Sequence, residues 1–517
     1  MKDNTRDLIK YLMIVTSVII LILIIIAIFE KPVEEPPQKI ISPSRELRGV
    51  WMSRFDYTQS LDTTDKTVMQ RYIQNSFQQV RDANCNVVFF QVRGNADAFY
   101  KSSYEPWSHL LSGTLGVDPG WDPLQFAIKT AHDLGLELHA WINAFPAWRG
   151  KSDPAPSNPI HPYSAHPEWL VCDSSGNQMP KTDHYVSFSP GNLNARQHIK
   201  NVVVEITSKY DIDGIHFDYI RYPEGSTLHG YSHDAESLKR FNSAMGNPLR
   251  LDWEDWQREQ VTQFIAGAYN AITAIKPRVK VSAAVIGNYN MPGWSGYHKV
   301  FQDAARWADI GKIDMIIPMT YRSRKDRAFQ KSIQLWNSIP NIDQPIAAGL
   351  GAYNLPFDEV LQEIDDSRFT GLSGVVFFAV SSVDSLEWIR LRNEKFPYPA
   401  IPPALPWKFS EKPPEPEECF VTLDSPTLNF TWTNSEPKDK GNSIRQFVIY
   451  RSIGDTLDIS DGASIFAILP GNTQQYQTAI QSEGLNYQYY ITALDEANNE
   501  SNPALFSDSK QANGASQ

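Results

Sequence analysis

The sequence predicts an α/β protein: a (β/α)8 TIM barrel followed by a small all-β sandwich, with one transmembrane helix at the N-terminus. Three observations support this fold class. Eight β-rich runs alternate with helical stretches between residues 45 and 396 of the 517-residue chain. Near Pro397 a proline-rich stretch leads into a segment with strand patterns only. An apolar run close to the N-terminus is long enough to cross a bilayer.

The N-terminal segment is predicted to be an uncleaved signal anchor. Residues 11–29 are apolar except for Thr16 and Ser17, and a helix of this length spans a hydrocarbon layer of about 30 Å. Basic residues precede the run, so residues 1–10 are placed in the cytoplasm and the rest outside it, in the periplasm or on the cell surface. A cleavable signal peptide is the alternative, but the run ends without a small-residue cleavage site. A proline-rich stalk is expected at residues 30–44.

The barrel is predicted over residues 45–396. Its strands are expected at 47–54, 86–93, 136–143, 213–222, 278–285, 313–321, 344–350 and 373–380. Helical stretches lie between them, for example at 67–83, 124–134, 195–210 and 256–275. An open doubly wound sheet is the alternative, but no glycine-rich dinucleotide fingerprint follows the first strand and eight strands suit closure. The long segments 144–194 and 223–255 are expected to be loops at the C-terminal rim.

The C-terminal part begins with a proline-rich linker at residues 397–411. Residues 412–506 are expected to form a β-sandwich, with a flexible tail at 507–517. The chain carries a net charge of −12, and eight of these excess negative charges fall from residue 412 onward. An acidic balance argues against a nucleic-acid partner. The three cysteines lie far apart, which excludes a disulfide-rich scaffold.

Barrel active sites lie at the C-terminal ends of the strands, so the alternation of side chains along each strand selects candidate residues. Within 213–222, Ile215, Phe217 and Tyr219 share a face that is expected to pack under the outer helices, whereas His216 and Asp218 face the barrel axis. A carboxylate inside a barrel is costly to bury unless it has a partner or a task. The other inward or rim-facing candidates are Gln91, Arg93, Asn95, Asp97, His139, Trp141, Asn143 and Tyr321. Together they predict a site for a polyhydroxylated ligand.

These candidates also have structural interpretations. Arg93 is suited to a core ion pair with Asp218, and His139 and His216 lie deep enough to be core residues. A metal site is disfavoured because the sequence has no HxH or HExxH cluster. It also lacks a GxSxG elbow and a P-loop. No cofactor or metal is therefore expected.

The C-terminal segment resembles a fibronectin type III module. The resemblance rests on Leu428, Phe430 and Trp432, on FVIYR at 447–451 and on YQYYITALD at 487–495. It implies a sandwich with Trp432 in its core. Modules of this kind commonly act as spacers, and contacts with envelope proteins are a candidate role.

The barrel segment resembles the glycosyl hydrolase-like 10 family. The motifs that carry the resemblance are RGVWMS (48–53), FFQVRGNADAFYKSSYEPWS (89–108), PGWDPL (119–124), HAWINAF (139–145), DGIHFDYIRYP (213–223) and PMTYRS (318–323). They occur in order and extend over about residues 45–395. The family implies a glycosidase of the bacterial cell envelope, and characterised relatives cleave peptidoglycan glycan strands that have lost their stem peptides. By this resemblance Asp218 is the catalytic candidate, and Arg221 and Tyr222 of the same motif are candidates for substrate binding.

A more distant similarity to chitinase-type barrels bears on the mechanism. Those barrels carry DGxDxDxE on the fourth strand, and here the position of the acid glutamate is Ile220, whereas the last aspartate of the motif is Asp218. Met319-Thr320-Tyr321 matches their sixth strand. Acid catalysis must then come from another carboxylate. The candidates are Glu224, Asp97 and Asp326.

Two mechanisms follow. In one, Asp218 is a nucleophile and a second carboxyl group about 5–5.5 Å away is the acid/base, which gives retention. In the other, Asp218 orients the substrate acetamido group, whose oxygen attacks with assistance from Tyr321. The alternative function is a barrel that binds an envelope glycan without cutting it. In either case the expected partners are a polysaccharide and, through the N-terminal helix, a membrane.

Overall fold

The computed structural model describes residues 42–182, 184–454, 456–479 and 487–508. Residues 42–517 form one compact unit. The predicted transmembrane helix at 11–29 lies outside the described residues, as do the predicted cytoplasmic segment, nearly all of the stalk and residues 509–517. Within the described ranges, no helix is both long and apolar enough to cross a membrane.

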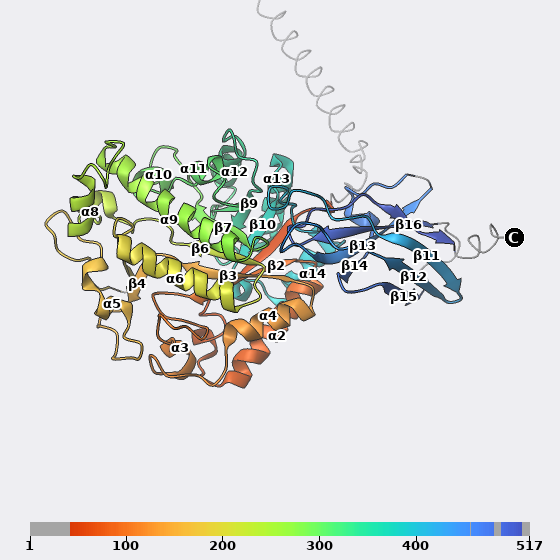
Figure 1. The fold of residues 1–517 in the computed structure, drawn as a ribbon, viewed down its shortest axis with the longest axis horizontal. Coiled ribbons are helices and arrows are strands. Elements are labelled where there is room, and N and C mark those ends of the chain that lie inside the picture. The colour runs from red at the N-terminus through yellow and green to blue at the C-terminus, as the bar shows by residue number, and fades with distance from the viewer. Residues whose placement is uncertain (1–41, 183, 455, 480–486, 509–517) are drawn as a thin grey trace, which may run out of the picture. The chain divides into compact units, whose positions relative to one another are not determined.

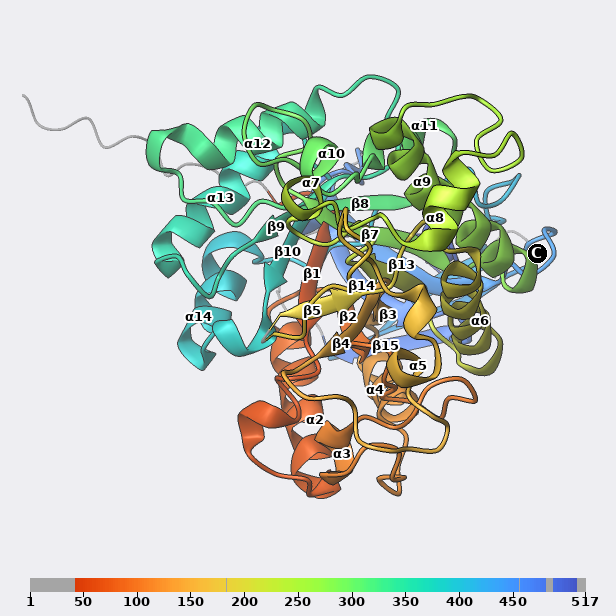
Figure 2. The ribbon, with the colours of Figure 1, turned by 90° about the vertical axis from the view of Figure 1, so that its left-hand side faces the viewer.

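Eight parallel strands close into a barrel in the order β1-β10-β9-β8-β7-β6-β3-β2. This confirms the predicted barrel and excludes the open sheet (Figures 1 and 2). The strands are β1 (Leu47–Met52), β2 (Val87–Arg93), β3 (Glu137–Asn143), β6 (Gly214–Asp218), β7 (Lys280–Ile286), β8 (Met315–Met319), β9 (Ala347–Leu350) and β10 (Gly374–Phe378).

Helices cover the outside of the barrel. The longer ones are α2 (Lys66–Asp82), α4 (Pro123–Asp133), α6 (Leu193–Lys209), α9 (Trp253–Ile275), α11 (Ala304–Asp309), α12 (Ala328–Asn337), α13 (Phe357–Thr370) and α14 (Ser385–Arg390). Helix α4 shows why they form where they do. The Asp122 side chain accepts a hydrogen bond from the backbone N–H of Gln125, and Pro123 occupies the first turn, where its missing N–H costs nothing. Its buried residues recur at helical spacing and face the strands.

Two apolar cores lie on the two sides of the barrel wall. The larger core, between strands and helices, includes Ile215 and Phe217. The smaller core fills the barrel and includes Trp51, Phe89 and Trp141. The predicted alternation is therefore confirmed for Ile215 and Phe217, which face outward, and for Phe89 and Trp141, which face inward. It is interrupted at the end of β2, where a register shift after Gln91 places Arg93 opposite the outward-facing Ile142.

The fourth predicted strand is shorter than expected. It ends at Asp218 because Tyr219 adopts a left-handed conformation with φ of 49°. The Tyr219 ring consequently lies 5.0 Å from the ring of Tyr185 instead of packing under the outer helices. The prediction for Tyr219 was wrong because it assumed that the alternation continued beyond the strand.

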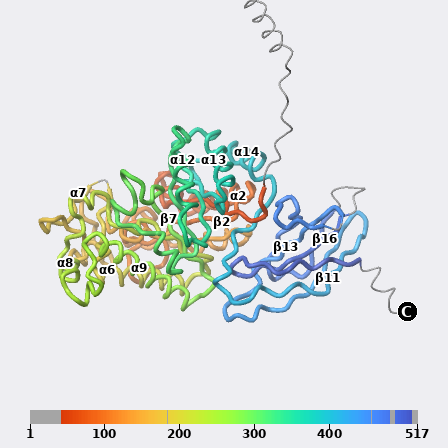
Figure 3. The backbone as a smooth tube through the Cα atoms, turned by 90° about the horizontal axis from the view of Figure 1, so that it is seen from above, coloured from red at the N-terminus to blue at the C-terminus, as the bar shows by residue number. Residues whose placement is uncertain are grey.

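The long segments 144–194 and 223–255 contain short elements. These are β4 (Pro146–Arg149), β5 (Tyr185–Ser187), α5 (Pro162–Ala165), η2 (Pro167–Trp169), α7 (Ser226–His229) and α8 (Ala235–Phe241). Figures 1 and 3 show α8 at the end of the barrel opposite the C-terminal sheets. Other short elements are α3 (His109–Ser112), α10 (Gly296–Lys299), η1 (Gln59–Leu61), η3 (Lys325–Arg327), η4 (Val380–Ser382) and η5 (Leu391–Lys395).

The C-terminal part forms two four-stranded sheets, as predicted for an all-β segment. One has the order β15-β12-β11-β18 and the other β14-β13-β16-β17. Their bounds are β11 (Glu417–Asp424), β12 (Thr427–Thr433), β13 (Ile444–Ile453), η6 (Gly462–Ser464), β14 (Ile465–Pro470), β15 (Gln475–Ala479), β16 (Tyr487–Asp495), β17 (Ala504–Leu505) and β18 (Ser507–Asp508). Phe430, Trp432, Phe447 and Ile491 share a buried core drawn from both sheets. The assignment to fibronectin type III stays a prediction.

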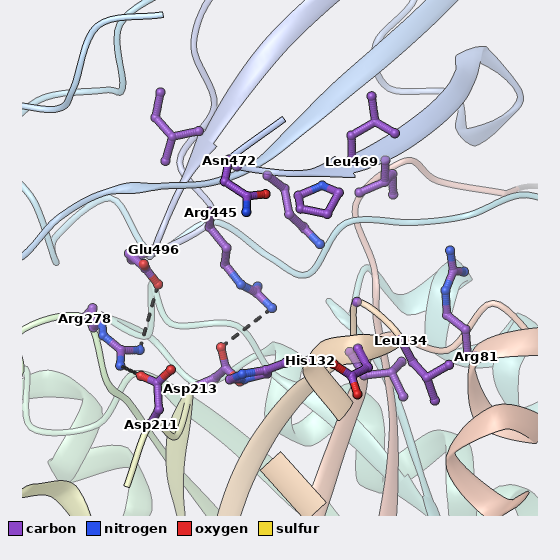
Figure 4. Close-up of a pocket in the computed structure, with 18 residues that line it drawn as sticks. Arg81, His132, Leu134, Asp211, Asp213, Arg278, Arg445, Leu469, Asn472 and Glu496 are labelled. Carbon is purple, nitrogen blue, oxygen red and sulfur yellow. Dashed lines mark hydrogen bonds and ion pairs between the residues drawn. The ribbon is translucent and has the colours of Figure 1, made fainter. Parts of the chain in front are cut away.

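Charged contacts join these sheets to the N-terminal end of the barrel, which we call the bottom. The Arg445 guanidinium of β13 contacts the Glu137 carboxylate of β3 and lies 3.7 Å from the Asp213 carboxylate. In Figure 4 Arg445 points from its sheet toward Asp213 across a cavity of about 570 Å³. The proline-rich linker is docked in the same way, since Lys408 Nζ lies 2.6 Å from the Asp314 carboxylate.

Candidate active site

Asp218 lies at the C-terminal end of β6, at the end of the barrel that we call the mouth. Its side chain is 6% exposed. Oδ1 accepts a hydrogen bond from the backbone N–H of Tyr219 at 2.6 Å and a longer one from Arg221 Nη1 at 3.4 Å. The described residues supply no hydrogen-bond partner for Oδ2, which leaves that oxygen for a ligand.

Burial raises the pKa of Asp218, while the Arg221 charge and the Tyr219 N–H pull it in the opposite direction. The net shift is upward, so the site holds a carboxyl group that takes up a proton more readily than an exposed aspartate. Perturbed carboxyl groups in a barrel mouth are candidates for acid, base or nucleophilic roles.

A chain of hydrogen bonds from Trp51 through His216 to Ser282 lies below Asp218 in the barrel. Trp51 Nε1 donates to His216 Nε2 at 2.9 Å, and His216 Nδ1 lies 2.9 Å from Ser282 Oγ. Because Nε2 accepts, Nδ1 carries the proton and donates to Ser282. Burial lowers the pKa of His216 well below its usual value, and His139 adds to the shift. His216 is thus a neutral core residue that fixes the Trp51 indole.

Aromatic side chains form one wall of the mouth. The Tyr321 and Phe378 rings are stacked at 5.6 Å, and Trp51 meets both rings edge-on at 6.4 and 6.1 Å. Tyr353, which is 56% exposed, also lies edge-on to Tyr321 and Phe378, at 5.9 and 5.8 Å. Burial and then the Asp218 charge raise the pKa of Tyr321 well above its usual value, so its hydroxyl stays protonated beside Asp218.

Gln91, Trp141 and Asn143 form a buried polar network. Asn143 Oδ1 accepts from Gln91 Nε2 and from Trp141 Nε1, each at 3.0 Å. Asn143 Nδ2 donates to the carbonyl of Gly94 at 3.0 Å. The structure therefore brings these three predicted binding residues together. Both polar atoms of the Asn143 side chain are hydrogen-bonded to other protein groups. Trp141 is 5% exposed.

Arg93 forms an ion pair with Glu105 at 2.7 Å, and both side chains are fully buried. The interpretation of Arg93 as the partner of Asp218 was therefore wrong. Arg93 also donates to the backbone carbonyls of Asn143 and Ala144. The sequence does not identify Glu105 as the partner of Arg93, because Glu105 lies in the loop after β2, where the alternation of side chains along a strand gives no information.

Asn95 and Asp97 shape the loop after β2. Asp97 Oδ1 accepts from the backbone N–H of Asn95 at 3.0 Å, and Asn95 Oδ1 accepts from Arg54 Nη2 at 3.1 Å. Both side chains are buried. A side chain at Gly94 would collide with the Arg54 guanidinium, so the absence of one makes room for that arginine. Arg54 follows β1, but alternation along that strand groups it with the outward-facing Val50 and Met52, so the rule used for the other strands could not select it.

Tyr185, Tyr219 and Arg221 form a second wall. The Arg221 guanidinium lies 4.2 Å from the centroid of the Tyr219 ring, and Arg54 Nη2 donates to the Tyr185 hydroxyl at 3.0 Å. Tyr222 is fully buried against Phe301 at 5.5 Å and takes no part in this wall.

Comparison with known proteins identifies the barrel. The family described as glycosyl hydrolase-like 10 matches residues 46–363, which run from just before β1 into α13. The chain belongs to the glycosyl hydrolase-like 10 family. Its relatives include glycosyl hydrolase YngK of Bacillus subtilis (strain 168), which is 28% identical over 491 residues, 88% of this chain and 92% of that protein.

A second relative is glycosyl hydrolase DigH of Escherichia coli (strain K12). It is 29% identical over 316 residues, which cover 56% of this chain and 68% of that protein. Among solved structures, alpha-L-fucosidase isoenzyme 2 from Paenibacillus thiaminolyticus aligns over 67% of this chain and 48% of its own, with a TM-score of 0.46 and 15% identity.

The three candidate acids of this glycosyl hydrolase-like 10 barrel differ in setting. Glu224 is exposed, and its charge contributes to the raised pKa of Tyr219, so it lies near the second wall. Asp326 is exposed in η3, and Asp97 is buried under its own loop. None of them is hydrogen-bonded to Asp218 in the part of the chain that the structure describes. No group of three His, Cys, Asp or Glu residues able to hold a metal ion occurs there either.

Proposed function

We propose that the chain is a membrane-anchored glycoside hydrolase that acts outside the cytoplasm on a cell-envelope polysaccharide. The proposed substrate is the glycan strand of peptidoglycan from which the stem peptides have been removed. The observation that carries the proposal is Asp218, a buried carboxyl group with one unoccupied oxygen at the mouth of a glycosyl hydrolase-like 10 barrel.

The walls of the mouth support a sugar substrate. Sugar rings present C–H faces that pack on aromatic rings, and Tyr353 offers an exposed ring beside Tyr321 and Phe378. The second wall supplies N–H and hydroxyl groups from Arg221 and Tyr219. A mouth with one apolar wall and one polar wall is typical of sites that orient a ligand by a few directed contacts.

Two catalytic routes use Asp218. In the first, its free oxygen attacks the anomeric carbon and a second carboxyl group protonates the leaving oxygen. Glu224 is the proposed acid for this route because it follows Asp218 closely in the chain and is exposed to solvent. In the second, Asp218 accepts a hydrogen bond from the substrate acetamido N–H, the acetamido oxygen attacks the anomeric carbon with assistance from the Tyr321 hydroxyl, and a second carboxyl group again protonates the leaving oxygen. Only the second route requires an N-acetylated sugar.

The test is an Asp218→Asn variant of the full-length chain, incubated with strands freed of stem peptides. We expect the release of new reducing ends to fall by about 10²–10⁴-fold, because the neutral amide cannot act as the nucleophile and lacks the negative charge that stabilises the acetamido group as its oxygen attacks. Asp133→Asn is the matched control, since Asp133 lies at the end of α4 with 61% of its side chain exposed. Full activity in an Asp218→Asn variant that unfolds at or above the wild-type temperature would contradict both routes.

A glycan-binding barrel without catalysis is the alternative. It is favoured by Ile220 at the place of the chitinase acid and by the absence, among the described residues, of a carboxylate hydrogen-bonded to Asp218. The same incubation distinguishes the two functions. Co-sedimentation of the wild-type chain with the strands, without new reducing ends, would identify a binding protein.

A further inference from the structure

Arg221 is a buried arginine whose donors are largely unused. Its side chain is 6% exposed and lies flat on Tyr219. Its one hydrogen bond to another described residue runs to Asp218 Oδ1 at 3.4 Å, and that oxygen already accepts the Tyr219 N–H at 2.6 Å. A guanidinium carries five N–H donors. None of the Arg221 nitrogens is among the buried, unpartnered atoms of the described residues, so its unused donors remain in contact with solvent in the mouth.

Two other arginines of this barrel, the buried Arg93 and the partly buried Arg368, use their donors at close range. Arg93 binds Glu105 through Nε and Nη2, at 2.9 and 2.7 Å. Arg368 binds both oxygens of Glu46, at 2.7 and 2.8 Å. These pairs are bidentate, which is the geometry that a guanidinium forms with a carboxylate. Arg221 has the same planar fork, held in place by Tyr219, but no carboxylate opposite it at that range within the described residues.

The charges around Arg221 do not cancel it at close range. Asp218 pairs with it through a single contact of 3.4 Å, which is longer than the contacts of the bidentate pairs. The exposed Glu224 acts on the Tyr219 ring. Behind Tyr185 lies a second buried guanidinium, Arg54, which Asp97 faces without direct contact. The wall thus presents a positive group with vacant donors next to the proposed catalytic carboxyl.

We propose that Arg221 binds a carboxylate carried by the substrate sugar and thereby selects glycan strands that bear free carboxylates. This inference rests on the proposed function. In peptidoglycan the lactyl carboxylate of the muramic acid residue is tied up in an amide bond while the stem peptide is attached, and it is free once the peptide has been removed. Because the Arg221 guanidinium needs a free carboxylate, it distinguishes peptide-free strands from peptide-bearing strands by charge and shape.

The test compares two forms of one substrate with the full-length chain. Strands freed of stem peptides are used as they are, or after carbodiimide coupling of their carboxylates to methylamine, which leaves the sugars intact and removes the charge. We expect the wild-type chain to have a kcat/KM on the order of ten- to a hundredfold higher for the free acid, the range of a hydrogen bond between charged groups. Arg221→Gln should bring this ratio close to one, and Arg221→Lys should keep part of it.

Arg71→Gln is the matched control, because Arg71 is an exposed arginine on helix α2, outside the barrel, and its loss changes the net charge equally. It should leave the ratio unchanged. Equal cleavage of both strands by the wild-type chain, or a ratio unaltered in Arg221→Gln, would overturn the inference. If no strand is cleaved, the proposed function fails separately, and the affinity of the chain for the two strands, measured by calorimetry, decides the inference by the same ratio.

Discussion

The two ends of strand β6 carry the same residue type in opposite environments. Asp213 lies just before the strand at the bottom of the barrel, and Asp218 ends it at the mouth; each is 6% exposed. Asp213 accepts from His132 Nε2 at 2.9 Å and from the Leu138 N–H at 2.8 Å, and Arg445 lies nearby. Asp218 has one backbone N–H and a long contact with Arg221.

The difference shows in the proton affinities. Interaction with Arg445 and His132 outweighs burial and lowers the pKa of Asp213, whereas burial wins and raises the pKa of Asp218. Equal burial therefore accompanies a lowered pKa at one end of the strand and a raised pKa at the other. The two aspartates differ in their positively charged partners. Asp213 lies close to His132 and Arg445, whereas Asp218 has one long contact with Arg221.

The C-terminal sheets supply part of the pairing at the bottom. Glu137 of β3 accepts from Lys280 of the barrel at 2.8 Å, but also from Arg445 and, at 3.0 Å, from Asn498 of the C-terminal part. The sheets are therefore more than a spacer, because they complete a buried ionic cluster that the barrel alone leaves open. Figure 4 shows this junction with Arg445 between the sheet and the barrel.

The largest expected effect comes from removing the Arg445 guanidinium, which pairs with both Glu137 and Asp213. Arg445→Met leaves Glu137 and Asp213 buried with fewer partners, and we expect it to lower the free energy of unfolding by about 3–5 kcal/mol. Urea unfolding followed by tryptophan fluorescence measures this loss. Arg451→Met on the same strand is the control, because Arg451 only stacks on Phe466 and Tyr487, and it should cost about 1 kcal/mol or less. Similar losses in the two variants would mean that the cluster contributes little.

An effect of intermediate size is expected at the mouth. Tyr353→Ala should raise KM by about tenfold or less with little change in kcat, because an exposed stacking ring contributes to binding more than to chemistry. Initial rates over a range of peptide-free strand concentrations give the two constants. Tyr398→Ala is the control, since Tyr398 is 40% exposed and its carbonyl accepts from Arg48, away from the mouth. An unchanged KM in Tyr353→Ala would remove this ring from the binding site.

The sequence was sufficient for the barrel and for its two faces, because alternation inside a strand follows from backbone geometry alone. That rule places Ile215 and Trp141 correctly. It fails at Tyr219, where one left-handed residue ends the strand. It also could not find the partner of Arg93, since Glu105 reaches it from a loop whose path depends on tertiary contacts.

For the candidate site, too, the sequence indicated some features and left others undetermined. The resemblance selected Asp218, and its environment at the mouth is now described, but its role as catalyst stays a prediction. Sequence alone could not reveal that the oxygens of Asn143 and Gln91 are taken up by neighbours, or that Tyr222 is sealed against Phe301. Such facts depend on which side chains meet across strands, and composition and spacing do not determine that.

The smallest expected effect tests the comparison directly through stability. A lowered pKa means that Asp213 stabilises the fold above its unfolded pKa of about 3.9, and that this stabilisation is lost as pH falls through the folded pKa. For Asp218 the sign is reversed: the fold favours the protonated form, so stability is lost as pH rises through the raised folded pKa. At pH 7 we therefore expect Asp213→Asn to lower Tm and Asp218→Asn to raise it. The Asp218 difference should shrink first as pH falls, because that carboxyl group becomes protonated in both states, and the Asp213 difference should begin to shrink only below its unfolded pKa of about 3.9. Calorimetric Tm values across pH 3–8 measure this, and shifts of the same sign would show that the two ends of β6 do not differ in the way described.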